Sequence, residues 1–108
     1  MNLLQTDANS FNAFLVAAYN NRVEVMRVLT KLGCNIYSTA KNGSTALHLA
    51  VKQGHIGVVR ELLKIKKFPI DAKKRNGLTA AALAVLKGDI VMLELLVSAG
   101  CDINSVSS

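Results

Sequence analysis

Several residue classes are scarce in this chain of 108 residues, and each scarcity excludes a class of protein. A single proline, Pro69, within a composition that is 51% hydrophobic and 19% charged argues against a disordered polypeptide. No apolar run exceeds seven residues, whereas a membrane span needs about 20. Residues 1–4 lack the basic start of a secretory signal. We therefore expect a soluble protein of the cytoplasm, with the nucleus as the alternative, and no membrane partner.

Acidic residues are also few, and their distribution argues against an enzyme. Seven Asp and Glu face thirteen Lys and Arg, which gives a net charge of +6 and favours acidic partners. The acids are scattered and form no acid–base pair on one face. The chain has neither a Gly-rich phosphate loop nor a nucleophile motif. We expect no catalytic activity and no cofactor.

Histidine is limited to His48 and His55. A metal site would need Cys or carboxylate side chains converging on them, and the spacing supplies none. The sequence therefore predicts no metal ligands.

Three segments recur with a period of 33 to 34 residues. Residues 12–17, 45–50 and 79–84 align at offsets of 33 and 34. The same offsets place apolar residues in shared columns, namely Val23, Ile56 and Ile90; Met26, Val59 and Leu93; and Leu29, Leu62 and Leu96. Several columns in register predict a repeat architecture.

Each segment predicts two short antiparallel helices. Apolar residues recur at spacings of three and four, and polar or glycine pairs at 20–21, 53–54 and 87–88 interrupt the pattern. Thr45 and Thr79 stand where first helices begin, as N-cap residues do. Turn dipeptides at 42–43 and 76–77 indicate that residues 36–43 and 70–77 form hairpin-like loops.

The chain resembles the ankyrin repeat family at this point. Residues 42–50, 54–56 and 58–63 follow the family pattern almost residue for residue. The resemblance implies an all-α ankyrin repeat solenoid of three helix–turn–helix repeats, over residues 7–39, 40–73 and 74–106 of a single domain, 1–108. It also implies that His48 braces a turn. Ala81 stands where Phe14 and Leu47 pack, which predicts either a thinner core in the third repeat or a neighbour that fills the space.

The two cysteines, Cys34 and Cys101, share a column two repeats apart. Packed helices lie about 8–10 Å apart, so the two Cα atoms should be separated by much more than the roughly 7 Å that a disulfide allows. We expect free thiols that fill small buried positions, as in a reducing compartment.

The concave surface of a repeat stack predicts the binding site. Its columns differ among the three segments, while the core columns agree, as expected for a common scaffold with a specialised face. The resemblance places protein-binding residues on the loop tips and first helices, at Phe11, Tyr19, Asn20, Lys41, Asn42, Ser44, Lys52, Gln53, Arg75, Asn76, Leu78, Leu86 and Lys87. Aromatic residues at one end and cations at the other predict a protein partner with interleaved acidic and apolar residues.

The last helix suggests an alternative function. Among residues 90–97 only Glu94 is polar, whereas a terminal repeat normally carries a polar outer face. Two interpretations stay open: a structural segment of a longer repeat array, or a self-associating assembly module. The predicted assembly face is Val91, Met92 and Leu95.

Two further features favour structural interpretations. The basic stretch at 64–75 is interpreted as a solvated loop, with an acidic-partner patch or a nuclear import signal as alternatives. Nucleic-acid binding would need aromatic platforms beside this charge, and only Phe68 qualifies. Asn104 occupies a position that can be hydroxylated in the resembled family, but a structural asparagine that ties the loop backbone is the favoured interpretation.

Overall fold

The computed structural model describes residues 11–65 and 67–102. Within them the chain forms six helices, in the order α1 (Ala13–Tyr19), α2 (Val23–Lys31), α3 (Ala46–Gln53), α4 (Ile56–Leu63), α5 (Ala80–Lys87) and α6 (Ile90–Ser98). Consecutive helices pair as α1 with α2, α3 with α4 and α5 with α6. The three predicted helical hairpins are confirmed.

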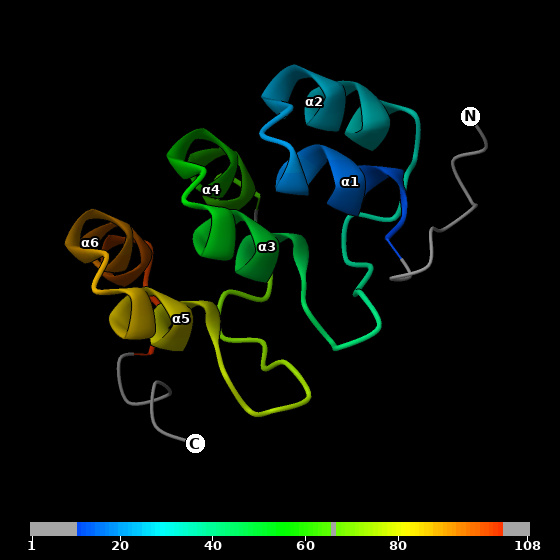
Figure 1. Cartoon of the computed structure of the whole chain (residues 1–108). Helices are drawn as coiled ribbons and strands as arrows, with labels where there is room; N and C mark the ends of the chain where they lie inside the picture. Colours follow the sequence, from blue (N-terminus) through cyan, green and yellow to red (C-terminus); the bar gives the residue numbers. More distant parts are fainter. Residues whose placement is uncertain (1–10, 66, 103–108) are drawn as a thin grey trace.

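The hairpins stack into two layers (Figure 1). The first helices α1, α3 and α5 form one layer and pack on one another in sequence order. The second helices α2, α4 and α6 form the other layer, in which α2 contacts α4. The long loops project together from the layer of first helices (Figure 1).

Side-chain caps determine where the first helices begin. Asn12, Thr45 and Thr79 have extended backbones, and each accepts a hydrogen bond from a backbone N–H three residues later. Such a cap satisfies a donor that lacks a partner within the helix. The caps predicted at Thr45 and Thr79 are confirmed, and Asn12 serves the same purpose in the first repeat.

Left-handed residues end these helices. Gly54 and Gly88 adopt φ values of 75° and 69°, and Asn21 has φ 62° in the turn of the first repeat. Glycine tolerates this conformation because it has no Cβ, and asparagine tolerates it better than most residues. The predicted interruptions therefore lie where the turns form.

The loops are hairpin-like, as predicted, and bond to each other. The Ala40 N–H donates to the Ser44 carbonyl at 2.8 Å, and the Lys74 N–H donates to the Leu78 carbonyl at 2.8 Å. The Arg75 N–H donates to the Asn42 carbonyl at 3.0 Å, which joins the second loop to the first. Gly43 sits at this junction with φ +82°, and a Cβ there would lie 3.0 Å from the Arg75 nitrogen. Position 43 therefore requires glycine both for conformation and for space.

The core runs through all three repeats. Phe14, Leu47 and Ala81 occupy one column, and each is 1% exposed. Neighbouring groups thus close over the smaller Ala81 side chain.

Candidate protein-binding face

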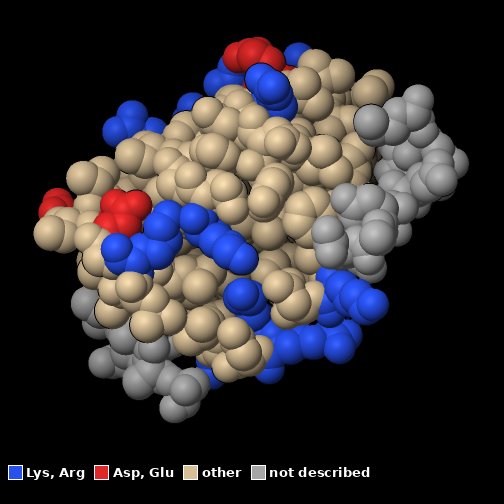
Figure 2. Space-filling model, in the orientation of Figure 1, with Lys and Arg blue, Asp and Glu red and all other residues tan. Residues whose placement is uncertain are grey.

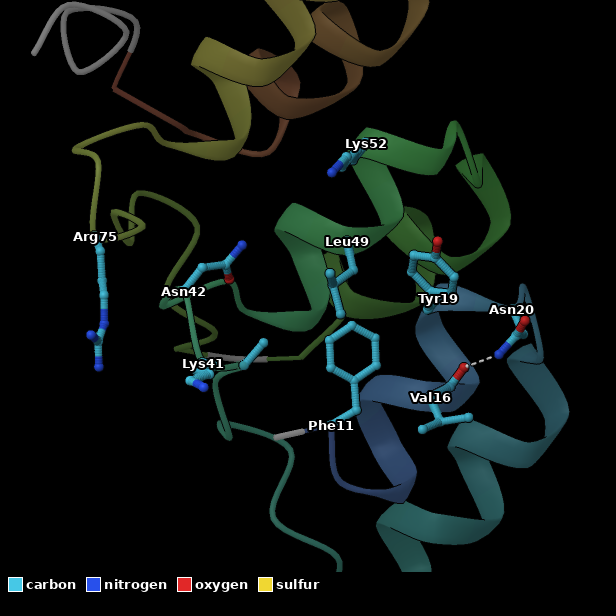
Figure 3. Close-up of a pocket in the computed structure, with 10 residues that line it drawn as sticks. Phe11, Val16, Tyr19, Asn20, Lys41, Asn42, Leu49, Lys52 and Arg75 are labelled. Atoms are coloured by element: carbon cyan, nitrogen blue, oxygen red, sulfur yellow. Dashed lines mark hydrogen bonds between the residues drawn. The ribbon is translucent and has the colours of Figure 1, made fainter. Parts of the chain in front are cut away.

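An open groove of about 780 Å³ lies on the concave side, where the first helices meet the loops (Figure 3). The helices α1 and α3 supply Val16, Tyr19, Leu49 and Lys52, and the loops supply Ala40, Lys41, Asn42 and Arg75. Phe11 and Asn20, at the two ends of α1, complete the lining. The groove is therefore built from repeats one and two together with the loop of repeat three.

The α1 side of the groove is aromatic. The rings of Phe11 and Tyr19 meet edge to face, with centroids 5.7 Å apart and an interplanar angle of 65°. Leu49 lies beside Phe11 in Figure 3. Tyr19 is 39% exposed, so this apolar surface is accessible to a partner. Partly exposed aromatic side chains of this kind are common anchors in protein interfaces.

The rest of the groove is cationic. Lys41 and Arg75 from the loops and Lys52 from α3 are exposed and line it, and none of the described lining residues is acidic. Figure 2 shows Lys and Arg over the loops and the centre of this face, with acidic side chains at its left and upper edges. The Arg75 backbone is held by the Asn42 carbonyl, so the loop contact positions this cation. The groove lining therefore carries positive charge on this side.

The structure gathers some of the predicted binding residues into the groove and leaves others outside it. Seven line the groove: Phe11, Tyr19, Asn20, Lys41, Asn42, Lys52 and Arg75. Five lie outside the lining: Gln53, Asn76, Leu78, Leu86 and Lys87.

Three residues outside the lining have structural contacts. The Asn76 Oδ1 accepts from the Leu78 N–H at 3.1 Å. The Lys87 ammonium donates to the Val51 and Lys52 carbonyls at 3.1 and 2.7 Å, so it caps the last turn of α3.

Ser44 requires a correction. Its side chain is 2% exposed, so the prediction that it lies on the binding surface is wrong. Ser44 lies between the turn at 42–43 and the Thr45 cap. Its N–H donates to the Asn42 Oδ1 at 3.0 Å, and its carbonyl accepts from Ala40. It therefore closes the loop.

The apolar floor of the groove was missed. Val16, Ala40 and Leu49 line it but read as ordinary core positions in the sequence. Val16 and Leu49 share an entirely apolar column with Leu83, so no sequence signal distinguished them from the core.

Sequence comparison determines the family. The ankyrin-repeat pattern, in three copies, matches residues 14–107. The chain belongs to the ankyrin-repeat family. Ankyrin repeats generally mediate protein–protein interaction, and the family consists of non-enzymatic interaction modules.

Curated relatives include larger ankyrin-repeat proteins. The chain is 33% identical to the chicken nuclear factor NF-kappa-B p105 subunit over 92 residues, which cover 83% of this chain and 9% of that protein. It is 36% identical to human NF-kappa-B inhibitor alpha over 95 residues, covering 83% of this chain and 30% of the relative. A Drosophila melanogaster DNA replication inhibitor, plutonium, is 37% identical over 67 residues, covering 62% of this chain and 38% of the relative. The ankyrin-repeat chain thus spans well under half the length of these relatives.

His48 links two of the ankyrin repeats. The Thr45 N–H donates to its Nδ1 at 3.0 Å, which leaves the proton on Nε2, and Nε2 donates to the Leu78 carbonyl at 3.1 Å. The turn-bracing role predicted for His48 agrees with these bonds. Burial lowers the pKa of His48, the Leu78 bond raises it in part, and the nearby Lys74 ammonium lowers it further.

The predicted assembly face also requires a correction. Met92 is fully buried, so its placement on an open face is wrong. Leu95 is half-buried, and Val91 is 61% exposed. The apolar residues exposed at this end of the ankyrin stack include Val85, Ile90 and Val97. Asn104 lies outside the described residues.

The thiols and possible metal ligands of the ankyrin chain are dispersed. Cys34 and Cys101 are free and half-buried. Burial raises the pKa of the Cys101 thiol, and Asp71 and Asp102 raise it further. Within the part of the chain that the structure describes, no three His, Cys, Asp or Glu side chains converge on a metal position. None of the helices in that part is long and apolar enough to cross a bilayer.

Proposed function

We propose that this ankyrin-repeat chain is a scaffold that binds a partner protein through its concave groove. Phe11 and Tyr19 would contact apolar side chains of the partner, above the buried Leu49. Lys41, Lys52 and Arg75 would contact its acidic side chains. The single observation that carries the proposal is the open groove in which an aromatic wall faces a cationic one.

The chemistry of the groove supports binding of an extended acidic segment. Among the residues that the structure describes, three cations and no acid line the groove. An acidic residue of the partner would therefore meet uncompensated positive charge, which raises association rates and specificity. Apolar residues beside it would bury the Phe11–Tyr19 pair and supply most of the affinity.

The relatives support a role exerted through binding. Two are named as inhibitors, one of NF-kappa-B and one of DNA replication. We infer that this chain likewise acts by occupying a surface of another protein. We also infer a cytoplasmic or nuclear location, which the free thiols Cys34 and Cys101 support, because reduced cysteines persist in those compartments.

Peptide selection followed by affinity measurement tests the proposal. A random peptide library displayed on phage is selected on the 108-residue chain, and enriched peptides are measured by fluorescence polarisation. We expect sequences that interleave Asp or Glu with aromatic or aliphatic residues. Tyr19→Ala should weaken their binding by about tenfold or more, as loss of an interface anchor does. Arg75→Glu should also weaken it, and the effect should shrink as salt is added.

Two matched controls separate the groove from the general surface. Tyr37→Ala removes an exposed tyrosine that does not line the groove, and Arg60→Glu makes the same charge change on the exposed surface of α4. Both should bind the peptides as the wild type does. Equal affinities for Tyr19→Ala, Arg75→Glu and the controls would move the binding site away from the groove.

A further inference from the structure

The two ends of the repeat stack expose apolar columns that are buried inside it. Val25 is 48% exposed, but Val58 and Met92, its equivalents in repeats two and three, are fully buried. At the other end Val85 is 49% exposed, while Ala18 and Val51 in the same column are fully buried. The first repeat thus presents the side that would receive a preceding repeat, and the third repeat presents the side that would receive a following one.

Each junction within the stack also carries a polar contact of one kind. The His55 Nε2 lies 2.9 Å from the Tyr19 carbonyl at the end of α1. The Lys87 ammonium donates to the Val51 and Lys52 carbonyls at the end of α3. In both cases the turn of the later repeat contacts the last-turn carbonyls of the earlier repeat's first helix. Carbonyls in the last turn of a helix carry partial negative charge, so a donor there stabilises the junction.

The first repeat has a donor at the equivalent position. Arg22 occupies the column of His55 and lines a groove of about 330 Å³, together with Ala13, Ala17, Val25 and Leu29. This groove has an apolar floor and a cationic rim. The last turn of α5 supplies the matching acceptors, because Leu86 shares a column with Tyr19 and Lys52.

Charged residues are complementary in the same register. Across the first junction Arg27 pairs with Glu61 through two hydrogen bonds of 3.0 and 3.1 Å, and Lys64 lies 3.7 Å from the same carboxylate. The equivalent of Arg27 in the third repeat is Glu94, and the equivalent of Lys64 in the first repeat is Lys31. Stacking the first repeat on the third would therefore bring Glu94 toward Lys31, again as opposite charges.

We propose that a second copy of this chain docks head to tail, its first repeat on the third repeat of the neighbour. The docked copies continue the register of the internal junctions. Val25 of one copy covers Val85 of the other, and the aliphatic part of Glu24 takes the place beside Ile90 that Gly57 takes beside Val23. Arg22 donates to the last-turn carbonyls of α5, and Lys31 pairs with Glu94. Such an interface joins two different surfaces, so it leaves one end open at each step and permits further addition. The groove around Arg22 shares Val16 and Asn20 with the lining of the concave groove, but the docking uses neither the aromatic nor the cationic residues on which the proposed function rests.

Sedimentation velocity over a concentration series, from micromolar to millimolar, tests this proposal. The average mass of the wild type should rise above 11.6 kDa with concentration. Val25→Asp blocks one end and Ile90→Asp blocks the other. Both substitutions lie in the first turn of a helix, where an added carboxylate is tolerated, so circular dichroism should show folded proteins. Each variant alone should remain a monomer.

Mixing the two variants gives the decisive result. Each retains one intact end, so an equimolar mixture should form a one-to-one dimer and grow no further. Arg22→Glu should weaken wild-type association by about tenfold or more, as loss of a charged hydrogen bond does, whereas Arg60→Glu should leave it unchanged. A wild type that stays at 11.6 kDa at every concentration overturns the proposal. An associating wild type whose two blocked variants fail to pair also overturns it.

Discussion

Repeats two and three are built on the same hairpin but are held differently. In repeat two, Thr45 caps α3, and the buried His48 imidazole links that cap to the Leu78 carbonyl of the next repeat. In repeat three, Thr79 caps α5 in the same way, but Ala82 occupies the histidine column and Ala81 the leucine column. The threonine cap therefore determines where each helix starts, while Leu47 fills the space between the repeats and His48 joins them.

Replacing Leu47 of repeat two should have the largest effect on stability. Leu47→Ala gives α3 the residue that Ala81 already gives α5, but at a position whose neighbours are packed around a larger side chain. We expect a loss of about 2–5 kcal/mol in the free energy of unfolding, measured by urea denaturation. Leu86→Ala, at a position 71% exposed, should cost far less. Equal losses for the two variants would mean that repeat two is not the packed centre of the stack.

Removing the histidine should have the next largest effect. His48→Ala gives repeat two the residue that repeat three already has at the equivalent position, Ala82. It leaves the Thr45 N–H and the Leu78 carbonyl without their ring partner. We expect a loss of about 1–3 kcal/mol, measured by urea denaturation. A loss near zero would show that the imidazole is dispensable in repeat two, as alanine is in repeat three.

The same histidine predicts a pH dependence. Because the pKa of His48 is lower in the folded than in the unfolded protein, the unfolded state binds the proton first as the pH falls. The stabilisation is complete well above the unfolded pKa of about 6.5 and decreases as the pH falls through that value. The urea midpoint of the wild type should therefore drop between pH 7.5 and about 5, and that of His48→Ala should drop less. An equal drop in the urea midpoint of the wild type and of His48→Ala would show that His48 does not cause the pH dependence.

Alanine substitutions at Gly33 and Gly43 should differ less in their effect on stability. Gly33→Ala and Gly43→Ala both place alanine at positive φ, which costs about 1–2 kcal/mol. Only at Gly43 does the added Cβ also meet the Arg75 nitrogen. Gly43→Ala should therefore be the more destabilising in thermal denaturation. Equal shifts would mean that the contact between the two loops adjusts freely.

A stabilising substitution should have the smallest effect. Lys67 has φ 65°, the left-handed conformation in which the closing glycines of the other repeats, Gly33 and Gly100, have φ 85° and 97°. Lys67→Gly removes this strain but adds freedom to the unfolded chain, so we expect a net gain of at most about 1 kcal/mol. A loss of stability on denaturation would show that the lysine side chain contributes more than its backbone costs.

The period and the caps made the fold predictable from the sequence. The columns of apolar residues, the threonines at 45 and 79 and the glycines at 54 and 88 act locally, so their consequences can be derived before any packing is known. Ser44 and Met92 could not be placed in this way. Ser44 is covered because the loop folds back at Ala40, and Met92 is buried because its column faces repeat two. Both facts depend on how the repeats stack.

The candidate site was also predictable only in part. Variable columns identified the cations and aromatics of the groove, because a binding face differs between repeats. Its floor of Val16, Ala40 and Leu49 has core-like composition and was not distinguishable from the interior. Lys87 was expected on the binding face, yet its ammonium bonds to α3 carbonyls, a contact that spans 35 residues of sequence.

The most direct test of the proposed binding surface is a chemical-shift map of the ¹⁵N-labelled chain titrated with a selected acidic peptide. We expect the largest shifts at Phe11, Tyr19, Lys41, Lys52 and Arg75, with little change along α4 and α6. Shifts concentrated on α4 and α6, with the groove unaffected, would contradict this expectation.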